Sequence, residues 1–307
     1  MKGPIVIAGG GPAGALLATY LGRAGHSVTV YESRPDLRVS EVDAGRSINL
    51  ALATRGIVPL IDIGVIDRVD EITIPMRGRM VHAVDDPNPV LQPYGSKTHE
   101  VIHSVGRTGL NAILLDAAEA TGNVELVFGR SIDRVDLETS TIHFADGGST
   151  EFGVILGADG VGSPVRAAMS DAGSCVWTTD RLDHDYKELT LPAGPTGEHQ
   201  LDRNALHIWP RGEFMLIALA NPGGDFTVTL FAPSTTFAHL DGGGDVDAFF
   251  AEHFPDFAAL TPDLDDQFRR NPTGRLGTLR TTGWSHEDRA VILGDAAHAI
   301  VPFHGQG

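Results

Sequence analysis

The chain of 307 residues is 42% hydrophobic and contains 37 glycines, a composition that excludes a disordered protein and allows one large or two modest domains. Its 23 basic and 40 acidic residues leave a net charge of −17, which argues against nucleic acid and anionic membrane surfaces as partners. Cys175 is the single cysteine, so an internal disulfide and a cysteine-based metal site are excluded. No apolar run approaches the length of a membrane span, and we expect a cytoplasmic protein with no membrane segment in this chain.

The first 32 residues predict a β-α-β unit. An apolar strand at residues 4–8 is followed by a glycine-rich turn, and apolar residues at helical spacing over 12–24 predict a helix before a second strand at 27–31. The free N–H groups at the start of such a helix can hold a pyrophosphate, and an acid at the tip of the second strand can bond ribose hydroxyls. The residues predicted to bind a dinucleotide here are Gly9, Gly11, Ala13, Gly14 and Glu32.

The middle of the chain predicts a helix and several short strands. The helix covers about residues 107–120, and the strands cover 124–128, 132–137, 141–144 and 154–156. From about residue 186 the pattern changes to closely spaced strands separated by Pro- and Gly-containing turns, which favours an antiparallel sheet. These later elements are strands at 206–209, 214–219 and 226–231, a helix at 246–254 and a final buried strand at 291–293.

Two later motifs decide between FAD and NAD as the dinucleotide. Gly157-Ala158-Asp159-Gly160 and Gly294-Asp295-Ala296-Ala297-His298 each follow a predicted buried strand. They resemble the second and third fingerprints of the flavoprotein aromatic hydroxylases. With the first glycine-rich turn, the three motifs stand in that group's order, so the resemblance implies FAD, with Asp159 and Asp295 as further contacts.

A narrower resemblance rests on six stretches between and around these motifs. They are GRSINLALATRG (45–56), MRGRMVH (76–82), YKEL (186–189), NALHIWPRGEFMLIAL (204–219), FTVTLF (226–231) and GDAAHAIVPFHGQG (294–307). Together they resemble the kynurenine 3-monooxygenase family, within the class A FAD-dependent aromatic hydroxylases, over essentially the whole chain. Members of that family continue past the final Gly-Gln-Gly. We therefore expect the C-terminal part of the family fold to be missing, which leaves the activity of this chain alone an open question.

The resemblance implies an α/β fold with two domains. A discontinuous Rossmann-like FAD-binding domain of the glutathione-reductase type is expected at residues 1–74, 97–174 and 275–307. A substrate-binding domain built on a mainly antiparallel sheet is expected at 75–96 and 175–274.

The resemblance also implies the chemistry. NADPH reduces FAD, O₂ adds to the flavin as a C4a-hydroperoxide, and L-kynurenine is hydroxylated to 3-hydroxykynurenine in tryptophan degradation. The cofactor carries the reaction, so no catalytic acid, base or metal is expected of the protein. The expected partners are an aromatic amino acid and O₂, and a homodimer is a possible assembly.

Site residues follow from the matching motifs. Arg79 is expected to hold the carboxylate of the substrate and Tyr94 to bond the same end, although a solvated strand residue and ordinary packing are their alternatives. His207 and Trp209 are interpreted as sheet core. The remaining implied contacts are Arg34, Ala51 and Arg107 with FAD, and Phe303, His304 and Gln306 in a loop facing the flavin.

Two other functions stay open at this point. Another flavin hydroxylase, acting on a phenolic acid, would share the FAD motifs. A catalytically silent flavin-binding protein, serving as a sensor or interaction module, would share them as well.

Overall fold

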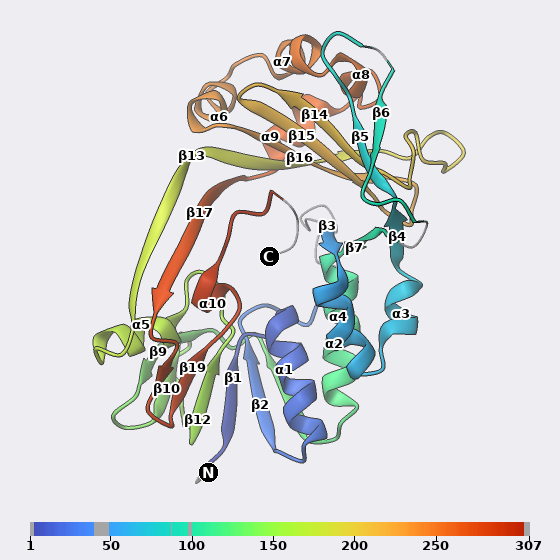
Figure 1. Cartoon of the computed structure of the whole chain (residues 1–307). Coiled ribbons are helices and arrows are strands. Elements are labelled where there is room, and N and C mark those ends of the chain that lie inside the picture. Colours follow the sequence, from blue (N-terminus) through green and yellow to red (C-terminus); the bar gives the residue numbers. More distant parts are fainter. Residues whose placement is uncertain (1–2, 40–48, 87, 98–99, 304–307) are drawn as a thin grey trace.

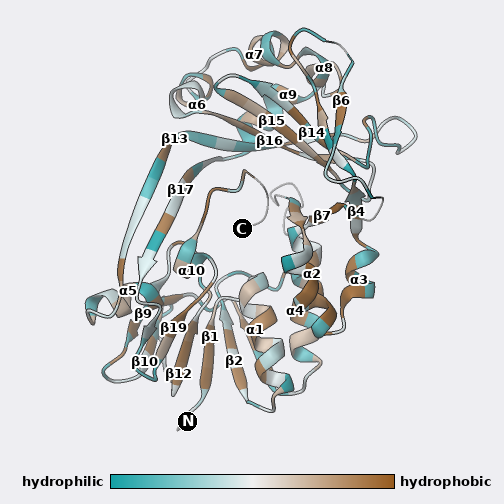
Figure 2. Ribbon diagram, viewed as in Figure 1, coloured by the Kyte–Doolittle hydropathy of each residue, from teal (hydrophilic) through white to brown (hydrophobic). Residues whose placement is uncertain are grey.

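The computed structural model describes residues 3–39, 49–86, 88–97 and 100–303, which fold around two large sheets (Figure 1). The first sheet has six strands in the order β18-β19-β12-β1-β2-β8, all parallel except β18. Its strands are β1 (Ile5–Ala8), β2 (Val28–Glu32), β8 (Val124–Phe128), β12 (Val154–Gly157), β18 (Ser285–His286) and β19 (Ala290–Ile292). All four residues of β1 are buried, as expected of a parallel strand covered on both faces, and Figure 2 shows hydrophobic residues along it.

Helices and a small sheet cover the first sheet. Helices α1 (Pro12–Arg23) and α4 (Arg107–Glu119) pack against each other and against one face. Near the other face lie helix α5 (Pro164–Asp171) and a three-stranded antiparallel sheet, whose strands share a core with β1 and β12. That sheet is formed by β9 (Ile132–Asp136), β10 (Thr141–Phe144) and β11 (Ser149–Glu151).

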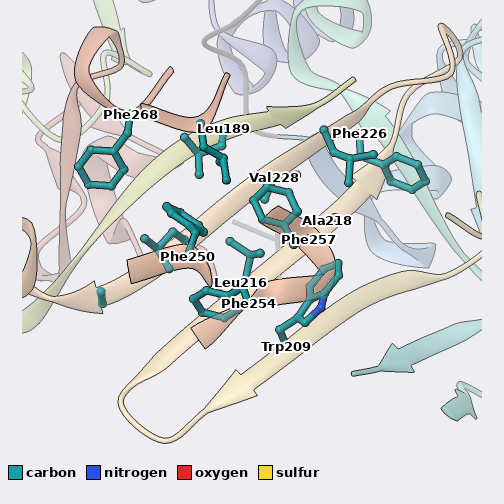
Figure 3. Close-up of a cluster of buried hydrophobic side chains, with 14 of the residues drawn as sticks. Leu189, Trp209, Leu216, Ala218, Phe226, Val228, Phe250, Phe254, Phe257 and Phe268 are labelled. Atoms are coloured by element: carbon teal, nitrogen blue, oxygen red, sulfur yellow. The ribbon is translucent and has the colours of Figure 1, made fainter. Parts of the chain in front are cut away.

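The second large sheet has seven strands in the order β17-β13-β16-β15-β14-β5-β6, antiparallel except where β14 meets β5. Its strands are β5 (Gly78–Val81), β6 (Val90–Pro93), β13 (Val176–Leu191), β14 (Leu206–Arg211), β15 (Phe214–Ala220), β16 (Phe226–Pro233) and β17 (Thr273–Thr282). One face is covered by α6 (Ser234–Asp241), α7 (Val246–His253), α8 (Pro255–Ala258) and α9 (Leu264–Arg270) (Figure 1). Figure 3 shows Trp209, Phe250, Phe254 and Phe257 filling the core between that face and the helices.

Each large sheet and the helices that cover it form one body of the fold. Two long strands and a small sheet connect the two bodies. Strands β13 and β17 pair along most of their length and run from the second sheet down to the first (Figure 1). The lower half of β13 is exposed and lacks apolar alternation, which is why the sequence did not predict it. The small sheet, β3-β7-β4, consists of β3 (Asn49–Leu52), β4 (Thr73–Met76) and β7 (Ile102–Gly106). Helices α2 (Thr54–Asp62) and α3 (Ile66–Asp70) follow β3 and lead the chain to β4. Among the described residues, no helix has the length and apolar character needed to cross a membrane.

Candidate cofactor and substrate site

A cavity of about 370 Å³ opens at the carboxyl ends of β1, β2 and β12. This is the edge of a parallel sheet at which ligands bind in open α/β folds. Six residues predicted from the sequence line it together: Gly9, Gly11, Glu32, Arg34, Arg107 and Asp159. Residues more than 100 positions apart in the chain therefore meet in one pocket.

The glycine-rich turn is shaped partly by the chain itself. Gly9 has φ of 97°, and a Cβ there would lie 2.4 Å from the carbonyl oxygen of Ala158. A Cβ on Gly14 would lie 2.0 Å from the carbonyl oxygen of Gly9, so both positions require glycine. Gly11, by contrast, has no atom within 4 Å of a Cβ built on it, and it precedes the first residue of α1. The space in front of Gly11 is therefore open to a ligand.

Glu32 is an ionised acceptor at this edge. Its Oε2 accepts from the Gly10 N–H at 2.8 Å, and its Oε1 accepts from the backbone N–H and the Nε of Arg34 at 3.0 and 2.9 Å. Burial by itself would raise the pKa of Glu32, but the hydrogen bonds from Arg34 outweigh burial and lower it. A carboxylate held in this way is able to accept further hydrogen bonds from hydroxyl groups.

Asp159 carries an unsatisfied polar atom into the pocket. Its Oδ1 is buried and has no hydrogen-bond partner among the described residues, and burial raises the pKa of the carboxyl group. Nearby, Arg166 donates to the carbonyl oxygens of Val161 and Ala296, which joins the second and third fingerprint motifs. A buried polar atom without a partner costs free energy, so Asp159 is arranged for a ligand that supplies one.

Arg130 is a pocket residue that the sequence interpretation missed. It lines the cavity beside Arg34 and Arg107, lies over the ring of Phe144 at 4.2 Å and pairs with Asp146 at 2.5 Å. Its position two residues after the predicted strand at 124–128 was the available signal. Arg34, Arg107 and Arg130 thus converge on one cavity, where guanidinium groups can form charge-assisted hydrogen bonds with a pyrophosphate.

A second group of side chains lies on the face of the seven-stranded sheet opposite the helices. Residues from neighbouring strands form an apolar group there, which we call the apolar strip: Leu206, Ile208, Ile217, Leu219 and Phe231, with Tyr94 and Phe303 packed against it. At the edge of this face, Arg79 pairs in register with Leu206, and its guanidinium lies 5.5 Å from the centre of the Tyr94 ring. No carboxylate among the described residues forms an ion pair with Arg79. A guanidinium that has no ion pair among the described residues thus lies at the end of the apolar strip.

Similarity to known proteins decides the family. Residues 2–175 match the family described as "FAD binding domain". Kynurenine 3-monooxygenase from Myxococcus xanthus (strain DK1622) is 44% identical to this chain, covering 100% of it and 68% of that relative's length. The enzyme of the same name from Xanthomonas axonopodis pv. citri (strain 306) is 46% identical, covering 99% of this chain and 68% of its own length. The chain belongs to the kynurenine 3-monooxygenase family. It is an FAD-dependent monooxygenase.

Solved structures show the fold of this kynurenine 3-monooxygenase family member. A tetrameric form of 2-methyl-3-hydroxypyridine-5-carboxylic acid oxygenase matches with a TM-score of 0.77 at 20% identity, over 100% of this chain and 79% of that one. PqsL, a probable FAD-dependent monooxygenase from Pseudomonas aeruginosa, matches with a TM-score of 0.77 at 19% identity, over 99% and 81%. The predicted mixed α/β fold is thereby confirmed.

Four further residues predicted from the sequence do not line the first cavity: Ala13, Ala51, Asp295 and Phe303. A Cβ built on Gly294 would lie 3.2 Å from the Cβ of Ala13, and Gly294 precedes the exposed Asp295 at the start of α10 (Asp295–His298). Ala51 is buried in β3, and Phe303 packs on Phe231 with 5.1 Å between ring centres. His304 and Gln306 lie outside the described residues.

A second cavity, of about 620 Å³, lies on the helix-covered side of the seven-stranded sheet, and none of the predicted site residues lines it. Beside it, His82 Nδ1 donates to Asp256, His82 Nε2 bonds His207 Nδ1, and His207 Nε2 donates to the carbonyl oxygen of Asp202, each at 2.9 Å. Trp209 also donates to Asp256. His207 and Trp209 are buried, in agreement with the prediction that they belong to the sheet core.

Burial of His207 makes the stability of the kynurenine 3-monooxygenase family member depend on pH. Burial lowers the pKa of His207 to about 4, so unfolding takes up a proton below pH 6.5. The contribution of neutral His207 is present above pH 6.5 and is lost as the pH falls toward 4, by roughly 3 kcal/mol. Urea unfolding at pH 7.5 and 4.5 checks this. The pH dependence should be smaller in His207→Gln than in the parent, and an equal dependence in both would contradict the prediction.

Proposed function

We propose that this protein hydroxylates L-kynurenine to 3-hydroxykynurenine, using FAD, NADPH and O₂. The observation that carries the proposal is the guanidinium of Arg79, which lies beside Tyr94 without an ion pair among the described residues, at the end of an apolar strip that faces away from the helices. This arrangement complements a molecule with a carboxylate at one end and an aromatic ring at the other. The names of the relatives that match the whole chain support the same substrate.

The residues of the first cavity fit FAD, which supplies the redox chemistry and the activation of oxygen when bound. We assign the pyrophosphate to the open space at Gly11, where the N–H groups at the start of α1 point toward it. Glu32 would accept from ribose hydroxyls, and Asp159 would gain the partner that its Oδ1 lacks. The remaining proposed contacts are Gly9, Ala13, Gly14, Arg34, Ala51, Arg107, Arg130 and Asp295, with Phe303, His304 and Gln306 facing the flavin.

The residues of the second group would bind and orient the substrate. A guanidinium can form two parallel hydrogen bonds with a carboxylate, which fixes direction as well as position. The apolar strip would hold the aromatic ring and exclude water from it. Holding the reacting ring carbon within about 3–3.5 Å of the electrophilic oxygen that it attacks is the main contribution such a site makes to the rate.

The division of labour between the two bodies belongs to the same proposal. Residues 1–74, 97–174 and 275–307 would form the FAD-binding domain, of the Rossmann-like type, and 75–96 and 175–274 the substrate-binding domain. We also propose a cytoplasmic location and a homodimer. NADPH would bind transiently, without a domain of its own.

The test separates the cofactor from the substrate. The purified chain should be yellow, release FAD on boiling and take up added FAD when depleted. L-kynurenine should perturb the flavin absorbance and stimulate NADPH oxidation, and chromatography should detect 3-hydroxykynurenine. A colourless protein that takes up no FAD would contradict the cofactor assignment.

Two outcomes would replace the proposed substrate. Turnover of a phenolic acid without any response to kynurenine would indicate another aromatic hydroxylase. Bound FAD without substrate-stimulated NADPH oxidation would indicate a flavin-binding protein with another role.

A further inference from the structure

Three polar side chains close a ring of hydrogen bonds where the small sheet β3-β7-β4 meets the seven-stranded sheet. Asn49 Nδ2 donates to Asn221 Oδ1 at 2.7 Å, Asn221 Nδ2 donates to Thr227 Oγ1 at 3.1 Å, and Thr227 Oγ1 donates to Asn49 Oδ1 at 3.2 Å. We call these three residues the amide ring. All its bonds run in one direction, so each group donates once and accepts once around it.

The direction of the amide ring is fixed by a charge outside it. Asn221 Nδ2 also donates to the carboxylate of Asp225 at 2.7 Å. A flipped Asn221 amide would place its oxygen against that carboxylate, which is repulsive. Asn221 Oδ1 must therefore face Asn49, and Asn49 must present its N–H₂ group there.

The amide ring joins the small sheet β3-β7-β4 to the seven-stranded sheet. Asn49 begins β3 and also donates to Ser104 Oγ of β7 at 3.0 Å, and Ser104 Oγ donates to the carbonyl oxygen of Ala220 at the end of β15 at 3.0 Å. Thr227 lies in β16. Asn49 and Ser104 are 3% and 1% exposed, so these bonds do not compete with water.

The connected strands carry both halves of the proposed site. On the flavin side, Ala51 follows Asn49 in β3, and Gly106, the partner of Asn49 in register, precedes Arg107. On the substrate side, Thr227 pairs in register with Leu219 of the apolar strip. The amide ring thus links the strands that carry the proposed flavin contacts to the strands that carry the proposed substrate contacts.

We infer that Asn49 is a positioning residue that sets the distance between the flavin and the substrate through the amide ring. The inference rests on the proposed function. None of the three residues lines the cofactor cavity, so loosening the ring should leave FAD in place while the substrate ring moves relative to it. Misplacement by about 1 Å is enough to impair a reaction that depends on alignment. NADPH, O₂ and a proton would then be converted to NADP⁺ and hydrogen peroxide without hydroxylation of the substrate.

Asn49→Asp is the sharpest test because it changes one N–H₂ group to an oxygen. The new oxygen faces Asn221 Oδ1, which Asp225 prevents from turning away. Thr227→Val removes the hydroxyl at equal size, and Thr227→Ser is the matched control that keeps it. We expect Asn49→Asp and Thr227→Val to yield at least about threefold less 3-hydroxykynurenine per NADPH oxidised, with FAD affinity within about threefold of the parent and Thr227→Ser unchanged.

The product formed per NADPH does not depend on how much protein is folded, so a merely stabilising role would leave it constant. An unchanged ratio in Asn49→Asp would overturn the inference. A parent that does not hydroxylate kynurenine would instead refute the proposed function. Hydrogen exchange of the FAD-bound protein then decides: the amides of β3 should exchange faster in Asn49→Asp and Thr227→Val than in Thr227→Ser, with α1 unaffected, and equal exchange in all variants would overturn the inference.

Discussion

Gly11→Val is expected to lower the affinity for FAD by at least about tenfold while the FAD-free protein stays folded. Gly11 has φ of −68° and ψ of 178°, a conformation open to any residue, and no protein atom lies within 4 Å of its Cβ position. The side chain would instead fill the space in which a pyrophosphate must approach the backbone. Flavin fluorescence titration measures the affinity, and thermal unfolding without FAD measures the fold.

Gly14→Ala provides the contrasting variant. Its Cβ would lie 2.0 Å from the Gly9 carbonyl oxygen, so the turn itself must move, and the FAD-free protein should lose stability. If the Gly11→Val variant binds FAD as tightly as the parent, the proposed position of the pyrophosphate at this end of α1 is wrong. If both variants fail to fold, the glycine at position 11 is required by the fold itself and not by a ligand.

Arg79→Ala is expected to weaken L-kynurenine binding by about 10- to 100-fold with FAD affinity unchanged. A hydrogen bond to a charged group contributes roughly 1.5–3 kcal/mol, and each 1.4 kcal/mol is a factor of about ten in affinity. Arg79→Lys should restore only part of the loss, because an ammonium group cannot form the paired bonds of a planar guanidinium. Perturbation of the flavin absorbance by kynurenine gives the dissociation constant.

Arg280→Ala is the matched control for that experiment. Arg280 pairs with Asp180 on the exposed part of β17 and β13, and four strands of the sheet separate β17 from β5, which carries Arg79, so its loss should leave kynurenine binding unchanged. Equal affinity in Arg79→Ala and the parent would return Arg79 to the role of a solvated strand residue.

The sequence predicted the elements whose pattern is local. Strands β8 and β10 begin and end where they were expected, and α1 and α4 differ by one residue at the C-terminal end. The glycine-rich turn and Glu32 were also placed correctly at the edge of a parallel sheet, because the order strand, turn, helix, strand determines that geometry.

Contacts between distant segments were not predictable in the same way. The apolar strip combines alternate residues of several strands. Alternation alone does not say which face of the sheet meets the helices and which face carries the apolar strip. The amide ring brings Asn49 to Asn221 and Thr227, more than 170 positions away, and single asparagines and threonines carry no periodic signal. Arg130 was missed because a glycine and an arginine after a strand are also common in turns.

The strand order of the first sheet also governs how the chain can fold during synthesis. Strand β1 emerges first, yet its neighbour β12 begins at residue 154, and β12 in turn pairs with β19, which begins at residue 290. The ribosome must therefore release the chain through β19 before this sheet is complete, and until then β12 presents an unpaired apolar edge. Such long-range pairing slows folding and lengthens the time during which nascent chains can associate wrongly. Production at low temperature with a slow rate of translation suits this topology.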